Sequence, residues 1–427
     1  MPVKKRPVKT PIRSLVAAIM LFEILAFLLI AMHPDRQDTE MLQAISLALY
    51  MPALCWFSTM ILPKFLPADR LLMALMNFLC GVGVVILYSM LPEKGTKQAM
   101  FYGLGLMVMV VCILVVRIIR SWRMLCWLII PAGLGLLLLP LLFGSWQDGA
   151  KNWVSVPFLG SFQPSEVVKL MLLVVLAYFF SAHRTLLQMT PAIIFTGGCL
   201  GLLMLQRDLG TALMYYFTAI ILFYAASGNV PLTVVGLGGG AGAAVVGYNM
   251  FAHVKVRVAM WRNPWSDALG KGYQIIQALL AIGSGGLVGV GLGLGQPRVI
   301  PAYYTDFVFA VICEQFGILF GICVVAVYVV IIVRGISLAL RARRSFLALL
   351  ALGCTSLLGV QTFVIIGGVI KLIPLTGITM PFISYGGTSM LSCMGLMGFL
   401  QGISSRVRED LEQDIEMAGA REGAGVS

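Results

Sequence analysis

Charged residues are scarce in this sequence. Only 11% of its 427 residues are Asp, Glu, Lys or Arg, whereas 59% are hydrophobic and the mean hydropathy is +0.95. Soluble domains carry about a quarter charged residues, so this composition excludes a soluble protein and indicates a polytopic membrane protein. The formal net charge is +12. The basic residues lie in short clusters between apolar runs, as membrane topology requires, and we therefore expect no nucleic-acid binding.

The sequence also lacks the patterns of a disulfide framework, a zinc site and a nucleotide site. Its nine cysteines all fall inside apolar runs, without CxxC pairs or metal-ligand spacing, and we interpret them as packing residues. No GxxxxGK[ST] loop is present, so we expect no organic cofactor. The basic amino terminus precedes an apolar run, but no small-residue cleavage site follows His33, which favours a first membrane anchor over a signal peptide.

Long apolar runs are what the sequence has in abundance. A membrane-spanning helix needs about 20 apolar residues, and about twelve such runs follow one another along the chain. They lie near residues 14–32, 41–62, 71–91, 99–119, 124–144, 164–182, 191–206, 211–228, 231–251, 306–333, 346–370 and 383–404. We therefore expect an all-α, polytopic helical bundle in a membrane, with contacts to membrane lipids around it.

The distribution of Lys and Arg over the connections predicts which face is cytoplasmic. Basic residues cluster at the amino terminus and at alternate connections, which marks those connections as cytoplasmic, and an even number of spans places both termini there. The opposite, extracytoplasmic face receives the segments 33–40, 145–163, 206–210, 252–305 and 371–382. The centre of 252–305 is apolar but glycine-rich, which favours an interfacial or re-entrant element over a spanning helix.

Asp306 stands at the outer end of one apolar run, where a carboxylate is costly to hold near hydrocarbon. One interpretation is a helix cap, in which the carboxylate accepts backbone N–H bonds. The other is a general base, which takes the proton from an attacking hydroxyl group. The residues alone leave both interpretations open.

Other polar residues in or near the apolar runs invite a structural interpretation first. Glu166 and Lys169 are three residues apart and can pair on one helix face. Glu314 lies eight residues after Asp306 and needs a partner in the bilayer, so we expect all three residues in ion pairs that join helices. Glu23, in the first run, has no charged neighbour at helical spacing and is unexplained. Trp153 by itself is typical of an interfacial tryptophan.

Basic residues on the outer face oppose the usual topological bias. An anionic substrate such as a lipid phosphate would explain them. They are Arg207, Lys255, Arg257, Arg262, Lys271 and Arg298.

Six motifs, in this order and spacing, resemble the SEDS family, whose members include RodA, FtsW and SpoVE. The motifs are GAKNWV (149–154), QPSEVVK (163–169), DLGTA (208–212), RNPWSDALGKGYQIIQALLAIGSGGLVGVGLG (262–293), TDFVFAVICEQFG (305–317) and PLTGITMPFISYGGTS (374–389). The resemblance divides the chain into about five amino-terminal membrane helices (1–148), a catalytic membrane core (149–405) and a cytoplasmic tail (406–427).

The resemblance implies a peptidoglycan glycosyltransferase. Such an enzyme polymerises lipid II, the undecaprenyl-diphosphate-linked disaccharide pentapeptide, on the outer face of the bacterial cytoplasmic membrane, during elongation, division or sporulation. A class B penicillin-binding transpeptidase is the implied partner. Asp306 matches the family's essential aspartate, and it would deprotonate the acceptor 4-hydroxyl, which attacks the donor's anomeric carbon with inversion while undecaprenyl diphosphate leaves.

The same resemblance, together with the basic outer residues, suggests which side chains bind substrate. The expected set is Trp153, Lys169, Arg207, Arg257, Arg262, Arg298, Ser384 and Tyr385. The arginines would neutralise the diphosphate, with or without a divalent cation such as Mg²⁺ or Mn²⁺.

The chain departs from the family pattern in two respects. The family usually has ten spans, three of them before its GAKxW motif, whereas five precede it here, which indicates an additional amino-terminal pair. Ala302 and Tyr304 stand where the family commonly has glutamate and histidine, and Arg207, Gln315 and Ile365 also differ from its pattern. Two alternatives to an enzyme stay open: a lipid II flippase or other transporter, and a non-catalytic scaffold for a transpeptidase.

Overall fold

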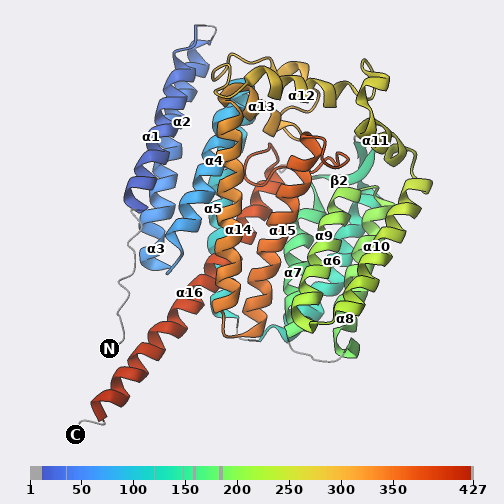
Figure 1. The fold of residues 1–427 in the computed structure, drawn as a ribbon. Helices are drawn as coiled ribbons and strands as arrows, with labels where there is room; N and C mark the ends of the chain where they lie inside the picture. Colours follow the sequence, from blue (N-terminus) through green and yellow to red (C-terminus); the bar gives the residue numbers. More distant parts are fainter. Residues whose placement is uncertain are drawn as a thin grey trace.

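The computed structural model describes residues 12–34, 36–119, 121–147, 149–156, 160–181 and 186–424. These residues form a helical bundle with one small sheet at its upper end (Figure 1). The helices are α1 (Ile12–Ala31), α2 (Asp38–Trp56), α3 (Leu62–Phe65), α4 (Arg70–Met90), α5 (Pro92–Ile118), α6 (Arg123–Phe143), α7 (Pro164–Ser181), α8 (Leu186–Leu205), α9 (Leu209–Ser227), α10 (Val230–Met250), α11 (Ala252–Arg262), α12 (Tyr273–Gly285), α13 (Val308–Phe316), α14 (Ile318–Arg341), α15 (Ser345–Val369) and α16 (Gly387–Ala424). The antiparallel sheet has the order β1 (Ser145–Gln147), β2 (Ala150–Val156) and β3 (Gly160–Phe162).

In the described part of the chain, eleven helical segments are long and apolar enough to span a membrane. One of these segments consists of α2, a π-helical turn and α3. The expected all-α membrane bundle is thus confirmed. The twelfth expected run, 383–404, is not among the eleven, and its helix begins later than expected, at Gly387. This first part of α16 nevertheless lies inside the bundle against α5, where Met394 and Met397 are fully buried.

The run expected as one helix over 306–333 is two helices, and that prediction was wrong. Helices α13 and α14 are separated by Gly317, whose φ is 84°. A Cβ atom on Gly317 would lie 2.3 Å from the carbonyl oxygen of Leu287, so only glycine permits this close crossing of two backbone segments. A Cβ atom on Gly321 would lie 2.7 Å from Cys313 Sγ, so the start of α14 packs directly against α13.

The amino-terminal pair α1 and α2 is joined to the rest of the bundle by buried polar side chains. Asn77 on α4 donates from Nδ2 to Ser58 Oγ and Thr59 Oγ1, each at 2.8 Å, and accepts from the Tyr102 hydroxyl at 2.8 Å. The π-helical turn Phe57–Ile61 carries both hydroxyl groups. Hydrogen bonds of this kind hold helices together where both are surrounded by hydrocarbon.

Glu23 on α1 also packs against α4. Its side chain is 1% exposed, and neither carboxylate oxygen has a hydrogen-bond partner among the described residues. A Cβ atom on Gly81 would lie 2.3 Å from Glu23 Oε1, so this glycine leaves the room that the carboxyl group occupies.

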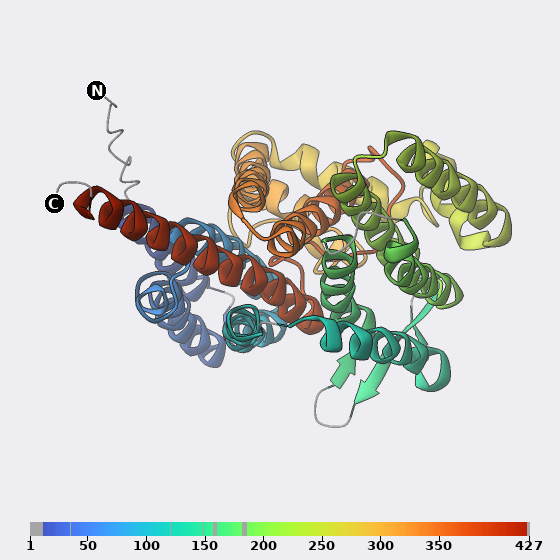
Figure 2. The same ribbon diagram turned by 90° about the horizontal axis from the view of Figure 1, so that it is seen from below.

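The segments expected on the outer face gather at one end of the bundle, the upper end in Figure 1. The 13-residue α12 is too short to span a bilayer, and it lies across the tops of the longer helices, as an interfacial element would (Figure 1). The first turn of α1 and the far part of α16 are at the other end. Helix α16 packs against α5, and its far part extends beyond the bundle, as the view from below shows (Figure 2).

Candidate active site

Asp306 lies in the turn 301–307 that precedes α13, at the upper end of the bundle. The helix begins at Val308, and its first residue is preceded by Phe307, which forms no side-chain cap. Asp306 therefore lies one residue before the N-cap position, and the choice between a cap and a general base stays a prediction. The aspartate is only partly buried.

Arg257 is the predicted cation that the structure brings close to Asp306. A Cβ atom on Gly377 would lie 3.5 Å from Asp306 Oδ2 and 3.7 Å from Arg257 Nη2, so the two side chains meet over this glycine. The φ of Gly377 is 74°, which a residue with a side chain rarely adopts. The backbone of Gly377, which has no side chain, therefore lies directly against Asp306 and Arg257.

Helix α11 holds Arg257 in this position. Arg257 Nη1 donates to the carbonyl oxygen of Thr376 at 3.0 Å, and one turn later Trp261 Nε1 donates to that of Lys371 at 3.2 Å. Burial lowers the pKa of Arg257, and the nearby charges of Asp306 and Asp208 oppose that shift. Since the ordinary pKa of arginine exceeds 12, the guanidinium group stays charged at neutral pH.

Asp208 is a second carboxylate near Arg257, and unlike Asp306 it is buried; the sequence analysis did not single it out. Its Oδ1 accepts the Thr211 N–H at 3.1 Å and caps α9. Its Oδ2 accepts from Asn152 Nδ2 at 2.9 Å and from Gln163 Nε2 at 3.2 Å, which ties the sheet to α9. An aspartate directly before an apolar run was the signal that could have identified this cap.

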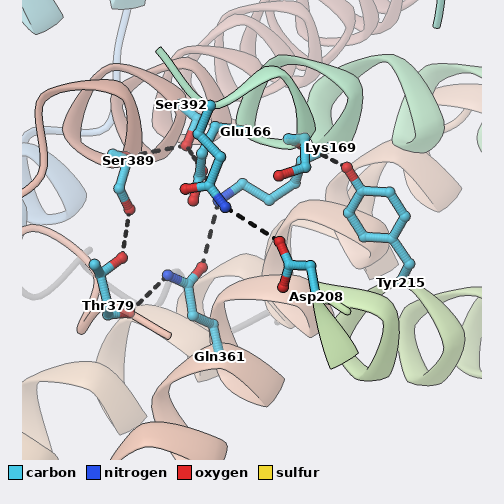
Figure 3. Close-up of polar contacts among 10 residues, drawn as sticks. Glu166, Lys169, Asp208, Tyr215, Gln361, Thr379, Ser389 and Ser392 are labelled. Atoms are coloured by element: carbon cyan, nitrogen blue, oxygen red, sulfur yellow. Dashed lines mark hydrogen bonds and ion pairs between the residues drawn. The ribbon is translucent and has the colours of Figure 1, made fainter. Parts of the chain in front are cut away.

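Glu166 and Lys169 form the expected ion pair, at 2.6 Å, inside a larger buried network (Figure 3). Lys169 Nζ also donates to Gln361 Oε1 at 3.5 Å, and Gln361 Nε2 donates to the carbonyl oxygen of Thr379 at 2.8 Å. The Ser392 hydroxyl donates to Glu166 Oε2. Lys169 is only 1% exposed, so in this structure it has no surface for the substrate contact that we expected of it.

The network continues toward Asp306 through the segment 379–385. Ser384 Oγ accepts the Met380 N–H at 2.9 Å and donates to the carbonyl oxygen of Thr305 at 2.5 Å. The Tyr385 N–H donates to the carbonyl oxygen of Tyr304 at 2.9 Å. Ser384 is 4% exposed, so it positions the backbone beside Asp306 and does not present its hydroxyl group to a substrate.

Glu314 is not in an ion pair with any described residue, contrary to expectation. It lies near the end of α13, where Oε1 accepts the Gln296 N–H at 3.0 Å and Oε2 has no described hydrogen-bond partner. A Cβ atom on Gly295 would lie 2.7 Å from Oε2. A backbone loop thus covers this carboxylate, which sequence spacing along a single helix could not reveal.

The other expected substrate-binding residues are spread over the upper end. Trp153 is half-buried in β2, opposite Ser145. Arg207, whose φ is 61°, places its guanidinium group 4.8 Å from the centre of the Trp146 ring and is exposed. Arg262 is exposed.

Arg298 is also exposed, and it lines a cavity of about 280 Å³ between the α1–α2 connection and the core. This cavity therefore lies where the additional amino-terminal pair meets the rest of the protein.

His253 is a neighbour of the site that the sequence analysis missed. It lies four residues before Arg257, on the same face of α11, and is half-buried. Burial lowers the pKa of His253, and the charges of Arg257 and Arg207 lower it further. The imidazole is therefore neutral at pH 7.

The described residues do not fit a built metal centre. No group of three or more His, Cys, Asp or Glu side chains is close enough together in the described part of the chain to hold a metal ion. Both oxygens of Asp208 already accept N–H donors. The divalent cation stays a prediction, and no step below depends on it.

Known proteins resemble this chain over most of its length. The family model described as Cell cycle protein, for FtsW, RodA and SpoVE, matches residues 69–409. Peptidoglycan glycosyltransferase RodA of Mycobacterium tuberculosis (strain H37Rv) is 35% identical over 378 residues, which cover 82% of this chain and 80% of that protein. Probable peptidoglycan glycosyltransferase FtsW of Geobacter metallireducens is 34% identical over 368 residues, with coverages of 80% and 95%.

One solved structure shows the same arrangement of helices. It is described as "Structural coordination of polymerization and crosslinking by a peptidoglycan synthase complex" and matches with a TM-score of 0.68 and 27% identity, covering 79% of this chain and 98% of that one. The family match begins just before α4, well ahead of Gly149, where the recognised motifs begin. Three long helices, α4 to α6, therefore belong to the matched part, and α1 and α2 precede it.

Proposed function

This chain belongs to the cell cycle protein family of FtsW, RodA and SpoVE, and on that premise we propose that its upper end polymerises lipid II with Asp306 as general base. The resemblance to the SEDS family is confirmed by this match. The protein is a multi-pass membrane protein and a peptidoglycan glycosyltransferase, so the transporter and scaffold alternatives are not carried further. The observation that carries the site assignment is the meeting of Asp306 and Arg257 over Gly377.

The reaction needs one proton acceptor and one leaving group. Asp306 takes the proton from the 4-hydroxyl group of the acceptor sugar, and that oxygen forms a bond to the anomeric carbon of the donor. The bond from this carbon to the diphosphate oxygen breaks, and its electron pair leaves with undecaprenyl diphosphate. Attack from the opposite side inverts the anomeric configuration, and Asp306 then releases its proton to water.

Arg257 supports the leaving group. The diphosphate oxygen that gains charge leaves from the face of the reacting carbon opposite the attacking hydroxyl, so its cation has to lie near Asp306 without being bound to the same hydroxyl, and Arg257 Nη2 meets Asp306 over Gly377. The bond from Nη1 to Thr376 fixes the guanidinium group before substrate arrives. A cation held in advance stabilises developing charge without reorganisation at the moment of reaction.

The proposed orientation places this site outside the cytoplasmic membrane and both termini inside. The ion pairs Arg334–Asp69 and Arg117–Glu409 lie where α4 begins and α5 ends, among basic residues that mark a cytoplasmic face. The five segments expected outside gather at the opposite end (Figure 1), and Asp306 directly follows one of them, 252–305. This distribution of charge supports an extracytoplasmic active site.

We also propose a crosslinking partner, a class B penicillin-binding transpeptidase. The support is the match to a chain from a solved complex whose description joins polymerization to crosslinking. The expected outcome is that co-purification with such a transpeptidase increases polymer yield. A yield that does not change with any transpeptidase encoded by the same cell would contradict this partner.

The decisive experiment measures polymerisation of fluorescent lipid II by purified protein in liposomes. We expect Asp306→Asn to abolish polymer while its thermal unfolding and insertion match those of the parent. Asp267→Asn is the matched control, because this aspartate lies in the outer segment before Asp306, accepts the Lys271 N–H at 3.0 Å and has no role in the proposed reaction. Parental polymer length and rate in the Asp306→Asn protein would refute the assignment of the base.

A further inference from the structure

A second cation lies near Asp306, on the first turn of α5. Lys94 Nζ is 3.0 Å from the centre of the Tyr304 ring and 5.1 Å from that of the Tyr385 ring. The two rings meet edge to face, with their centres 6.1 Å apart. An ammonium group over aromatic faces is attracted by the negative charge density of the rings, so this arrangement holds Lys94 in a defined place.

Hydrogen bonds lock the two rings beneath Lys94. Gln98, one helical turn further along α5, is fully buried, donates from Nε2 to the carbonyl oxygen of Ser384 at 3.0 Å, and accepts the Gly386 N–H at 3.3 Å. These bonds attach the segment that carries Tyr385 to the helix that carries Lys94. The Tyr385 N–H in turn binds the carbonyl oxygen of Tyr304.

Lys94 has no described acid as an ion-pair partner, although the charge of its neighbour Glu93 acts on it. Lys97, three residues later, forms an ion pair with Glu93 at 2.6 Å, whereas Lys94 forms none with the described residues. Its side chain is only partly buried. A cation held by ring faces keeps N–H donors for an anion, and a charge-assisted hydrogen bond to phosphate is stronger than a neutral one.

Lys94 and Arg257 approach the site from different sides. The start of α5 and helix α11 lie on opposite sides of the segment that leads into α16 (Figure 1). Tyr304, under Lys94, is two residues before Asp306, and Arg257 meets Asp306 over Gly377. The outer end therefore has one cation at the reacting position and another beyond it.

We propose that Lys94, with Tyr304 and Tyr385, binds the diphosphate of the acceptor lipid. This inference rests on the proposed function, in which both substrate molecules carry a lipid-linked diphosphate. The donor diphosphate is attached to the reacting carbon and belongs beside Arg257. The acceptor diphosphate is separated from the attacking 4-hydroxyl by the disaccharide, so it needs a second cation farther from Asp306, and Lys94 is in that place.

The kinetic test compares three variants of the full chain in liposomes. We expect Lys94→Met to raise the KM for lipid II about tenfold, the loss of roughly one charge-assisted contact, with kcat within about twofold of the parent. Lys94→Arg should restore the KM. Lys97→Met, the matched control on the same helix, should leave it unchanged because Glu93 already neutralises this lysine.

A binding test separates this inference from the assignment of the base. Undecaprenyl diphosphate is titrated into the Asp306→Asn protein, which retains both cations whether or not Asp306 is the base. We expect two binding events, of which Lys94→Met removes one and Arg257→Met the other.

Several results would overturn the proposal. These are two unchanged binding events in the Lys94→Met protein, a fall in kcat at constant KM, and an equal effect of Lys97→Met. If Lys94→Met weakens lipid II binding but not undecaprenyl diphosphate binding, the anion is a carboxylate of the peptide, and the diphosphate assignment is wrong.

Discussion

Two acid–base pairs lie within the upper half of this bundle and differ in how completely they are enclosed. The pair Glu166–Lys169 is buried, and its charged atoms are bound by Gln361 and Ser392 as well as by each other. Asp306 is partly exposed and meets Arg257 over bare backbone at Gly377. An enclosed pair stabilises and positions, whereas a partly exposed pair is accessible to a substrate with which it can exchange a proton.

The buried pair Glu166–Lys169 is connected to the partly exposed pair Asp306–Arg257 through the segment 379–385. Gln361 donates a hydrogen bond to the carbonyl oxygen of Thr379, and Ser384 donates one to the carbonyl oxygen of Thr305, the residue before Asp306. Substitutions in the buried network should therefore mainly lower the stability of the protein, and substitutions of Asp306 or Arg257 should mainly lower the polymerisation rate. The following predictions test that distinction, from the largest expected effect to the smallest.

Lys169→Met should cause the largest loss of stability. It leaves Glu166 buried without its cation, which typically costs about 3–5 kcal/mol. We expect a clear fall in the thermal unfolding temperature of the purified protein in detergent. The double variant Glu166→Gln with Lys169→Met removes both charges and should recover part of that loss; equal stability of the single and double variants would contradict an enclosed ion pair.

Arg257→Met should lower the polymerisation rate about 100- to 1,000-fold, the usual effect of removing one preorganised group that stabilises developing charge. Its thermal unfolding temperature should change little, because the residue is only partly buried. Arg257→Lys keeps the charge but not the second donor that binds Thr376. Its polymerisation rate should therefore lie between those of the parent and the Arg257→Met protein. If Arg257→Met loses much stability but keeps the parental polymerisation rate, Arg257 has a structural role like that of Glu166 and Lys169, and the prediction is wrong.

Gly377→Ala should reduce both rate and stability by a moderate amount. A positive φ costs a residue with a Cβ atom about 1–2 kcal/mol, and the new methyl group would lie 3.5 Å from Asp306 Oδ2. Initial rates and unfolding temperatures measured together check this. Gly228→Ala is a control, since its φ is 63° and nothing lies within 4 Å of the added Cβ, so it should lose stability but not rate.

His253 should give the smallest effect, a weak dependence of stability on pH. Its pKa is lower in the folded protein than in the unfolded chain, where it is about 6.5. The unfolded chain therefore binds more protons near and below pH 6.5, and the folded state loses stability as the pH falls through that range. His253→Gln should reduce this slope in unfolding temperature between pH 7 and pH 5, and an unchanged slope would show that His253 does not contribute.

Much of the fold follows from local properties of the sequence. Apolar length predicted the spans, because each helix must cross the same thickness of hydrocarbon, and Lys and Arg positions predicted which segments share an end. The ion pair Glu166–Lys169 was also accessible, because residues three apart lie on one helix face. The resemblance of the motifs located Asp306 without any knowledge of its surroundings.

Other features escaped prediction because they depend on backbone direction or on residues far apart in the chain. The break at Gly317 is hidden inside a continuous apolar run, so Glu314 was assigned to a long helix and given an ion pair that is not there. Nothing in the spacing of Lys94 and Tyr304 indicates that one covers the other.

The sequence by itself determined that this chain is a helical membrane protein, and it predicted which end carries the site and which aspartate stands at its centre, because hydrophobicity, charge distribution and motif order are properties of short stretches. Only the tertiary structure decided which charges are enclosed and which are open, and that Arg257 and Lys94 approach Asp306 from different helices. Those relations are set by distances across the fold, and a distance between residues remote in sequence exists only once the helices have packed.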